Sequence, residues 1–453
     1  MRPSSRFTSA SPALLAMIGV VLLATRWPLL VHGYGSDDDA WRYVVSALHT
    51  RASGAYQPSR VPGFPAFELP LALLVPLGPF ATNLVAAFAG LLGAWLFWRI
   101  ARRLQHPRPG FLALGLALTP AFWVQATQTM DYAQATAFLL AGWLALLQAR
   151  AGWAGVWLAL AAASRPTLVL IAPIAGLYLM LSGARWGSLA RFAVGFGVVF
   201  TGLELPAMLH PDTQGASAHF AFHAARQHVT FGTLVPVVRG AIVFLVGKLG
   251  APLLLIGLGL GWRSRDPRAR LGAPIERDAS LVFELFSLAT IALLYLLVPL
   301  DTGYLIPALP LVLSLAARIA LPGWLLAALV AVSLETLAQP LLGAGRIVPG
   351  RLVLEVRERQ RQIDEAKSEA IRVVSQPTVF IASRPLVHRM VVLAPFFTRE
   401  PAAWKPFWAS GVALWSPDRR RGYAVDLSPA ERAALEVQGY AIVKLAHSSA
   451  VSR

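Results

Sequence analysis

The stretch that decides the fold is Pro12–Val31, PALLAMIGVVLLATRWPLLV, with the polar loop Gly35–Tyr43, GSDDDAWRY, close behind it. The first stretch is long enough to cross the ~30 Å hydrocarbon core of a bilayer as a helix. The loop places three of the chain's 23 acidic residues side by side. Adjacent negative charges repel one another, and the low dielectric near a membrane strengthens the repulsion. We therefore expect this loop to carry the chemistry of the protein.

Apolar runs of similar length recur along the 453 residues to about residue 341. Hydrophobic residues make up 56% of the chain and charged residues 14%, against roughly 45–50% and about 25% in soluble domains. The net charge of +17 comes largely from arginines in short loops between apolar runs, the pattern that orients a chain in a bilayer. These features predict an all-α polytopic membrane bundle. The absence of cysteine excludes disulfides, thiolate metal sites and cysteine nucleophiles.

Hydropathy and arginine positions together predict about eleven transmembrane helices, with the N-terminus inside as an uncleaved signal anchor. Residues 66–78 are apolar but short and contain Pro70 and Pro76, which predicts an interfacial or re-entrant helix. Residues 153–181 are broken by Ser-Arg-Pro-Thr. Because proline disfavours helix at the residue before it, we expect a broken pair with Arg165 near its outer tip.

The chain is expected to divide into two parts. Residues 1–342 form the transmembrane part, with external loops at 32–66 and 208–239. Residues 343–453 are richer in charge and contain no run of membrane length. This segment is predicted to be a small soluble α/β domain. With the N-terminus inside, an odd number of spans places it on the outer, extracytoplasmic face of the membrane.

Three local patterns support the α/β prediction for the C-terminal segment. Residues 352–374 have helical spacing, and 377–382 and 440–445 have the pattern of strands. A helix is expected to begin at Ser428, because a serine cap is followed there by proline and then by glutamate at the third position.

The acidic loop has two interpretations. Apolar positions from Ala40 to Thr50 have helical spacing, so the carboxylates before them suit an N-terminal cap and the helix dipole. Capping needs one carboxylate, or two at most. The functional interpretation is a general base, or a metal ligand, held where a lipid-linked substrate reaches it.

An acidic pair in the first external loop, a short helix, Gly-x-Tyr at Gly54–Tyr56 and a proline-rich turn at Pro58–Pro65 resemble the GT-C glycosyltransferases. That group includes the protein mannosyltransferases, the aminoarabinose transferase of lipid A and the mycobacterial arabinosyltransferases. The resemblance implies a catalytic base in the first loop that activates an acceptor hydroxyl for inverting attack on a polyprenyl-phosphate sugar. Asp38 fits best, because Asp38-Asp39-Ala40-Trp41 matches the Asp-Asp-Ala-aromatic form. The third aspartate leaves Asp37 and Asp39 open as candidates.

The departing lipid phosphate needs cations, and bidentate arginine contacts suit it. Two of the candidate substrate-binding residues also have a structural interpretation. Asp131 is well placed to cap a helix, and Arg165 is well placed to snorkel at a helix break. His219 and His223 have metal-pair spacing, so a divalent metal ion is an open possibility. The expected substrate-binding residues are Asp131, Arg60, Arg165, Arg226, His223 and Tyr43.

The predicted function is therefore transfer of a sugar from a polyprenyl-phosphate donor to a glycan, lipid or protein acceptor at the outer face of a bacterial inner membrane. The alternative is a polytopic lipid or solute transporter or flippase. Transporters usually contain two related halves and ionisable residues near the middle of the membrane, and the sequence has no internal repeat. It also has no phosphate-binding glycine loop after a strand, and the basic charge does not indicate nucleic acid.

Overall fold

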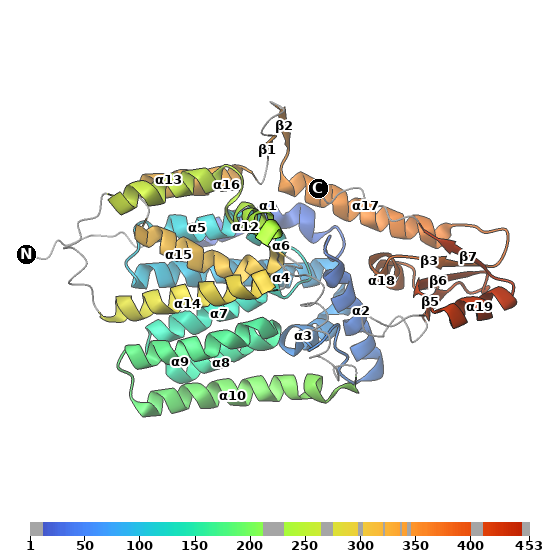
Figure 1. Cartoon of the computed structure of the whole chain (residues 1–453), viewed down its shortest axis with the longest axis horizontal. Helices are drawn as coiled ribbons and strands as arrows, with labels where there is room; N and C mark the ends of the chain where they lie inside the picture. The colour runs from blue at the N-terminus through green and yellow to red at the C-terminus, as the bar shows by residue number, and fades with distance from the viewer. Residues whose placement is uncertain are drawn as a thin grey trace, which may run out of the picture.

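A bundle of helices with a small α/β unit at one end makes up the protein, as seen in the computed structural model (Figure 1). The helices of the bundle lie roughly side by side, and the sheet lies beyond the end that carries α2 (Asp38–Ser53) and α3 (Pro65–Leu74). This arrangement confirms the predicted combination of a helical bundle with a C-terminal sheet. The structure describes residues 12–211, 231–263, 275–297, 302–319, 322–335, 338–341, 346–399 and 411–445.

Several bundle helices begin at a proline, which has no N–H to leave unpaired in the first turn. Pro65, Pro109 and Pro120 open three of them. The bundle elements are α1 (Pro12–Leu30), α2 (Asp38–Ser53), α3 (Pro65–Leu74), η1 (Val75–Leu77), α4 (Gly78–Arg103), α5 (Pro109–Leu118), α6 (Pro120–Gln125), α7 (Tyr132–Leu147), α8 (Ala151–Ser164), η2 (Pro166–Leu170), α9 (Ile171–Leu181), α10 (Trp186–Leu209), α12 (Phe231–Val246), α13 (Gly250–Arg263), α14 (Ile275–Leu297), η5 (Thr302–Ala308), α15 (Leu309–Ile319) and α16 (Pro322–Leu334).

The number of membrane spans differs from the prediction. Among the described residues, four helical stretches are long and apolar enough to cross a bilayer, or five if the bent pair α12–α13 is one span. Six further apolar helices are shorter, so eleven spans are not confirmed. The four stretches are Pro65–Arg103, Trp186–Leu209, Ala279–Leu297 and Thr302–Ile319.

Small residues allow α8 and α10 to pack closely. A Cβ on Gly155 would lie 2.3 Å from the Phe192 carbonyl oxygen, and a Cβ on Gly195 would lie 2.5 Å from that of Gly152. Such close approach of two backbones is typical of membrane helices.

The predicted break at residues 164–167 is confirmed. Helix α8 ends at Ser164, Arg165 is extended, and η2 begins at Pro166 before the chain continues as α9. Because α8 and α9 lie side by side as a hairpin, the break between them lies at the same end of the bundle as α2 and α3 (Figure 1).

Two stretches fold differently from the prediction. The loop expected over 208–239 is helical at both ends, since α10 extends to Leu209 and α12 begins at Phe231. The last span, expected to reach residue 341, ends at Leu334 and is followed by the hairpin of β1 (Ala338–Leu341) and β2 (Arg346–Pro349).

The C-terminal unit has a five-stranded sheet of order β4-β5-β6-β3-β7, in which β3 is parallel to both of its neighbours and β4, β5 and β6 are antiparallel. Successive residues of β3 face opposite sides, as strand geometry requires: Phe380 packs toward α17 and α18, and Val379 packs with Leu435 of α19. Ser428 and Glu431 form the predicted capping box. The elements are α17 (Arg351–Ile371), β3 (Thr378–Ile381), α18 (Arg384–Leu393), β4 (Thr398–Arg399), β5 (Gly411–Trp415), β6 (Arg421–Asp426), α19 (Pro429–Val437) and β7 (Ala441–Lys444).

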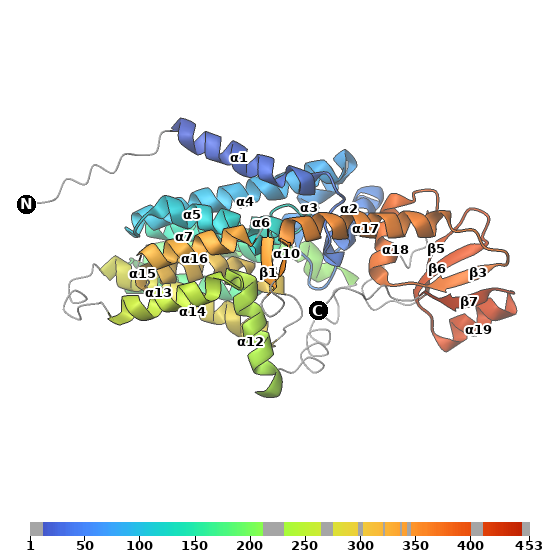
Figure 2. The same ribbon diagram turned by 90° about the horizontal axis from the view of Figure 1, so that it is seen from above.

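Helix α17 joins the two parts. It extends from the hairpin along the bundle and past α2 to the sheet (Figure 2). Its first half packs on Leu29 and Trp123 of the bundle, and Ala366 and Ala370 of its second half lie in the core of the C-terminal unit.

Candidate active site

The three aspartates of the acidic loop have three different environments. Asp37 is the N-cap of α2, and its Oδ1 accepts a hydrogen bond of 3.0 Å from the Asp39 amide. The capping interpretation therefore holds for one carboxylate. Asp38 and Asp39 follow in the first turn of α2, so the loop keeps two carboxylates for other partners.

Asp39 binds two arginines. Its Oδ2 forms an ion pair with Arg60, and its Oδ1 lies 3.4 Å from Nη1 of Arg42. Arg60 also donates to the Tyr43 hydroxyl at 2.7 Å, and its guanidinium lies 4.3 Å from the centre of the Phe64 ring. Arg60 and Tyr43, both predicted to bind substrate, therefore contact each other beside Asp39.

A second ion pair lies next to Arg60. Asp131 is 0% exposed and Arg165 is 2% exposed, and their Oδ2 and Nη1 atoms are 2.7 Å apart. Nη2 of Arg60 is 3.9 Å from Oδ1 of Asp131, which connects the two pairs. The guanidinium of Arg165 stacks between Tyr132 and Tyr304, 4.0 and 4.2 Å from their ring centres.

The contacts of Asp131 and Arg165 differ from those expected of a helix cap and of a snorkelling arginine. Asp131 occupies the N-cap of α7, yet its side chain makes no capping hydrogen bond. Arg165 turns inward to Asp131 instead of toward solvent. Asp39, Arg60, Asp131 and Arg165 thus alternate in charge along one row, which we call the charge row.

The proline-rich turn that carries Arg60 is held by Glu68. This buried carboxylate accepts from the amides of Ser59 at 2.8 Å and Phe64 at 3.0 Å, and from the Tyr56 hydroxyl. Glu68 sits on α3, whose apolar sequence gave one signal of this role: a lone acid in an otherwise apolar run. Glu68 was not predicted as a site residue from the sequence.

Asp38 lies outside the charge row. Its side chain is 56% exposed, and its Oδ1 accepts a 2.7 Å hydrogen bond from Arg389 of α18. Desolvation by the surrounding elements raises the pKa of Asp38, and the positive charge of Arg389 opposes that rise. Arg389 was not predicted as a site residue, because nothing in the sequence links α18 to a loop 351 positions away.

Two predicted residues, Arg226 and His223, lie outside the described residues, as does His219, the other member of the predicted metal pair. His210, at the end of α10, is described. In the described part of the chain, no group of three or more histidine or acidic residues has the arrangement of a metal site.

Comparisons with known proteins bear on this arrangement. Residues 66–205 match the dolichyl-phosphate-mannose-protein mannosyltransferase family. A search of curated protein sequences found no match. Among solved structures, apo ArnT from Cupriavidus metallidurans matches with a TM-score of 0.52 and 14% sequence identity, over 83% of this chain and 84% of ArnT.

Two further structures align less closely. ArnT bound to undecaprenyl phosphate gives a TM-score of 0.48 at 16% identity, over 84% of this chain and 70% of that one. The arabinofuranosyltransferase AftD from mycobacteria gives 0.44 at 19% identity, over 83% of this chain and 31% of AftD. The family match and the fold shared with apo ArnT confirm the predicted resemblance to the GT-C glycosyltransferases. Together with the apolar helices, they also support the prediction of an integral membrane protein.

Proposed function

We propose that this protein is an inverting glycosyltransferase that moves a sugar from a polyprenyl-phosphate donor to an acceptor at the outer face of the membrane. The observation that carries the proposal is the charge row, two arginines and two carboxylates, whose Asp39 follows the half-exposed Asp38 in the first turn of α2. The GT-C resemblance agrees with it.

Arg60 and Arg165 suit the donor phosphate. A guanidinium carries five N–H donors in a planar fork that matches phosphate oxygens. The Nε atoms of both arginines are buried and have no acceptor among the described residues. Each arginine therefore keeps a donor for a ligand while its aromatic neighbours fix the plane of the fork.

Asp38 suits the general base better than Asp39. Both oxygens of Asp39 face arginines, whereas Asp38 uses Oδ1 for Arg389 and its Oδ2 has no partner in the described part of the chain. A base needs a free lone pair within reach of the substrate proton. Its raised pKa also moves Asp38 toward the range in which a carboxylate accepts a proton more readily.

The proposed reaction is one displacement. The acceptor hydroxyl oxygen attacks the anomeric carbon, and its proton passes to Asp38. The bond from that carbon to the phosphate oxygen breaks, and the electron pair leaves with the polyprenyl phosphate, whose charge Arg60 and Arg165 stabilise. A single in-line displacement inverts the anomeric configuration.

The same proposal includes the topology. Residues 1–342 form the catalytic membrane part, with about eleven passes when the shorter helices also cross, in a bacterial inner membrane. Residues 343–453 form the domain on the outer face, next to the acidic loop. Arg226 and His223, in the segment after α10, are proposed to contact the donor or the acceptor.

Transfer of radiolabelled sugar tests the proposal. Membranes containing wild type, Asp38→Asn or the control Asp364→Asn receive a panel of polyprenyl-phosphate sugars, beginning with undecaprenyl phosphate carriers. Asp364 lies on the exposed side of α17, and among described side chains it accepts a hydrogen bond only from Gln360. Loss of product in Asp38→Asn alone supports the proposal. If Asp38→Asn still forms product, the general base is another residue. If no donor gives product and the protein moves lipid across the membrane, the transporter alternative is favoured.

A further inference from the structure

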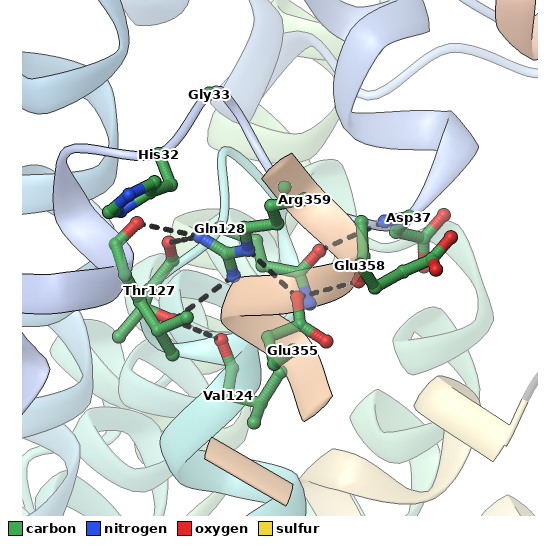
Figure 3. Close-up of polar contacts among 12 residues, drawn as sticks. His32, Gly33, Asp37, Val124, Thr127, Gln128, Glu355, Glu358 and Arg359 are labelled. Carbon is green, nitrogen blue, oxygen red and sulfur yellow. Dashed lines mark hydrogen bonds and ion pairs between the residues drawn. The ribbon is translucent and has the colours of Figure 1, made fainter. Parts of the chain in front are cut away.

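Helix α17 is fixed in the bundle by Arg359. This arginine is 1% exposed and donates to the carbonyl oxygens of Leu29 at 2.7 Å and Thr127 at 3.0 Å. Its Nε lies 2.8 Å from Glu355 on the same helix. Figure 3 shows its guanidinium between Thr127 and Glu355. A buried cation with this many partners is costly to displace, so α17 is held at one position on the bundle.

The same helix holds the acidic loop. Ser36 donates to Glu355 at 2.6 Å, and Gln362 donates to the Ser36 carbonyl at 3.0 Å. On the bundle side, the Asp37 amide donates to Gln128 at 3.2 Å (Figure 3). The start of α2, which carries the proposed base, is therefore held between α17 and the segment before α7.

Helix α18 then brings Arg389 to Asp38. The Arg389 side chain is 6% exposed, so it is confined against α2, and its Nη2 is 2.7 Å from Oδ1 of Asp38. A charge-assisted hydrogen bond at this distance fixes which oxygen is engaged and which way the carboxylate is turned. The Arg389 Nε is buried with no acceptor in the described part of the chain.

We propose that Arg389, supplied by the C-terminal unit, is a positioning residue for the general base Asp38. It holds Oδ1, turns Oδ2 toward the acceptor, and keeps the carboxylate ionised until the proton is transferred. This inference rests on the proposed function, because it assigns a role to a residue that acts through Asp38. It also makes the C-terminal unit part of the catalytic site.

The charged groups around Asp38 determine in which direction its pKa moves when Arg389 is replaced. On its own helix, Arg42 lowers the pKa of Asp38, while Glu358 of α17 raises it. Arg361 of α17 is paired with Glu358. On α18, burial and then Arg42 lower the pKa of His388 to about 3, so it stays neutral over an assay range of about pH 5–9. The remaining neighbouring charges are Asp37, Asp39, Glu365 and Arg384.

Removing the positive charge of Arg389 therefore raises the pKa of Asp38. In the dependence of kcat/KM on pH, the acidic limb reports this group. We expect Arg389→Gln to move that limb to higher pH by ~1 unit, the effect of one close opposite charge, and Arg389→Lys to restore most of the wild-type profile. Arg432→Gln, a control at an exposed position of α19 on the other face of the sheet, leaves the limb in place. Coincident profiles for wild type and Arg389→Gln would overturn the inference.

A crosslink tests the contact without any activity. Because the chain has no cysteine, Asp38→Cys with Arg389→Cys gives a single reactive pair for a short bifunctional maleimide. We expect intramolecular crosslinking in that pair and none in Asp38→Cys with Arg432→Cys, since α19 lies on the other face of the sheet. Absence of the first crosslink rejects the inference. Crosslinking of this pair, together with no transfer activity in the wild-type protein, rejects the proposed function and leaves the contact standing.

Discussion

Replacing Asp131 with alanine tests the buried half of the charge row. Asp131 and Arg165 are 0% and 2% exposed and their charged atoms are 2.7 Å apart. Arg60, 3.9 Å away, has Asp39 as a second partner, whereas among described residues Arg165 has no other carboxylate. The variant therefore leaves the Arg165 charge buried and uncompensated.

Breaking a buried pair by removing one partner costs ~3–5 kcal/mol, and this is the loss in free energy of unfolding that we expect for Asp131→Ala. Replacing both residues, Asp131→Leu with Arg165→Met, removes both charges and is expected to recover most of that loss. The pair Arg361–Glu358, whose side chains are 45% and 30% exposed, is worth less than ~1 kcal/mol. Arg361→Gln is therefore the matched control.

The assay is denaturant unfolding of the purified protein in detergent, followed by tryptophan fluorescence. Trp123 and Trp143 are buried in the bundle, so their emission reports the loss of its packing. If the double variant loses as much stability as Asp131→Leu and Arg165→Met lose separately when added together, the reasoning is refuted, because the two charges are then not coupled.

Three further predictions concern other contacts. Arg60→Lys is expected to raise the KM for the donor ~10-fold, by loss of one charge-assisted hydrogen bond, in initial-rate measurements; an unchanged KM would contradict a phosphate contact. Arg359→Ala leaves the Leu29 and Thr127 carbonyls unbonded and should lower the free energy of unfolding by ~2–3 kcal/mol, whereas a change below ~0.5 kcal/mol would show that α17 is not held there. Ser428→Ala removes one cap and should cost ~1 kcal/mol in the same assay, and Ser428→Thr should cost less; equal losses would argue against the cap.

Local patterns in the sequence predicted the elements that depend on local chemistry. The Ser428 cap, the break before Pro166 and the helix after Asp37 all follow from residues within a few positions of one another. The bundle with its C-terminal sheet followed from composition. The span count could not be settled in this way, because helices such as α8 are shorter than the hydrocarbon core requires.

The site was predicted only in part, because its contacts join distant segments. The sequence identified Asp39, Arg60, Asp131 and Arg165 as separate candidates, and the bundle brings them into one row. Asp131 was as good a cap as a site residue by local rules, and only the position of Arg165, 34 residues later, favours the second role. A pairing at such separation leaves no periodic or local signal in one sequence.

The most direct test of the central claim is release of free polyprenyl phosphate from a lipid-linked sugar donor by the purified protein, since that lipid is the leaving group of the proposed reaction. With donor and acceptor present, we expect release by wild type, with the sugar appearing on the acceptor in inverted anomeric configuration. Asp38→Asn should release ~10²–10⁴-fold less. Release at the wild-type rate by Asp38→Asn, or a product of retained configuration, would contradict the account.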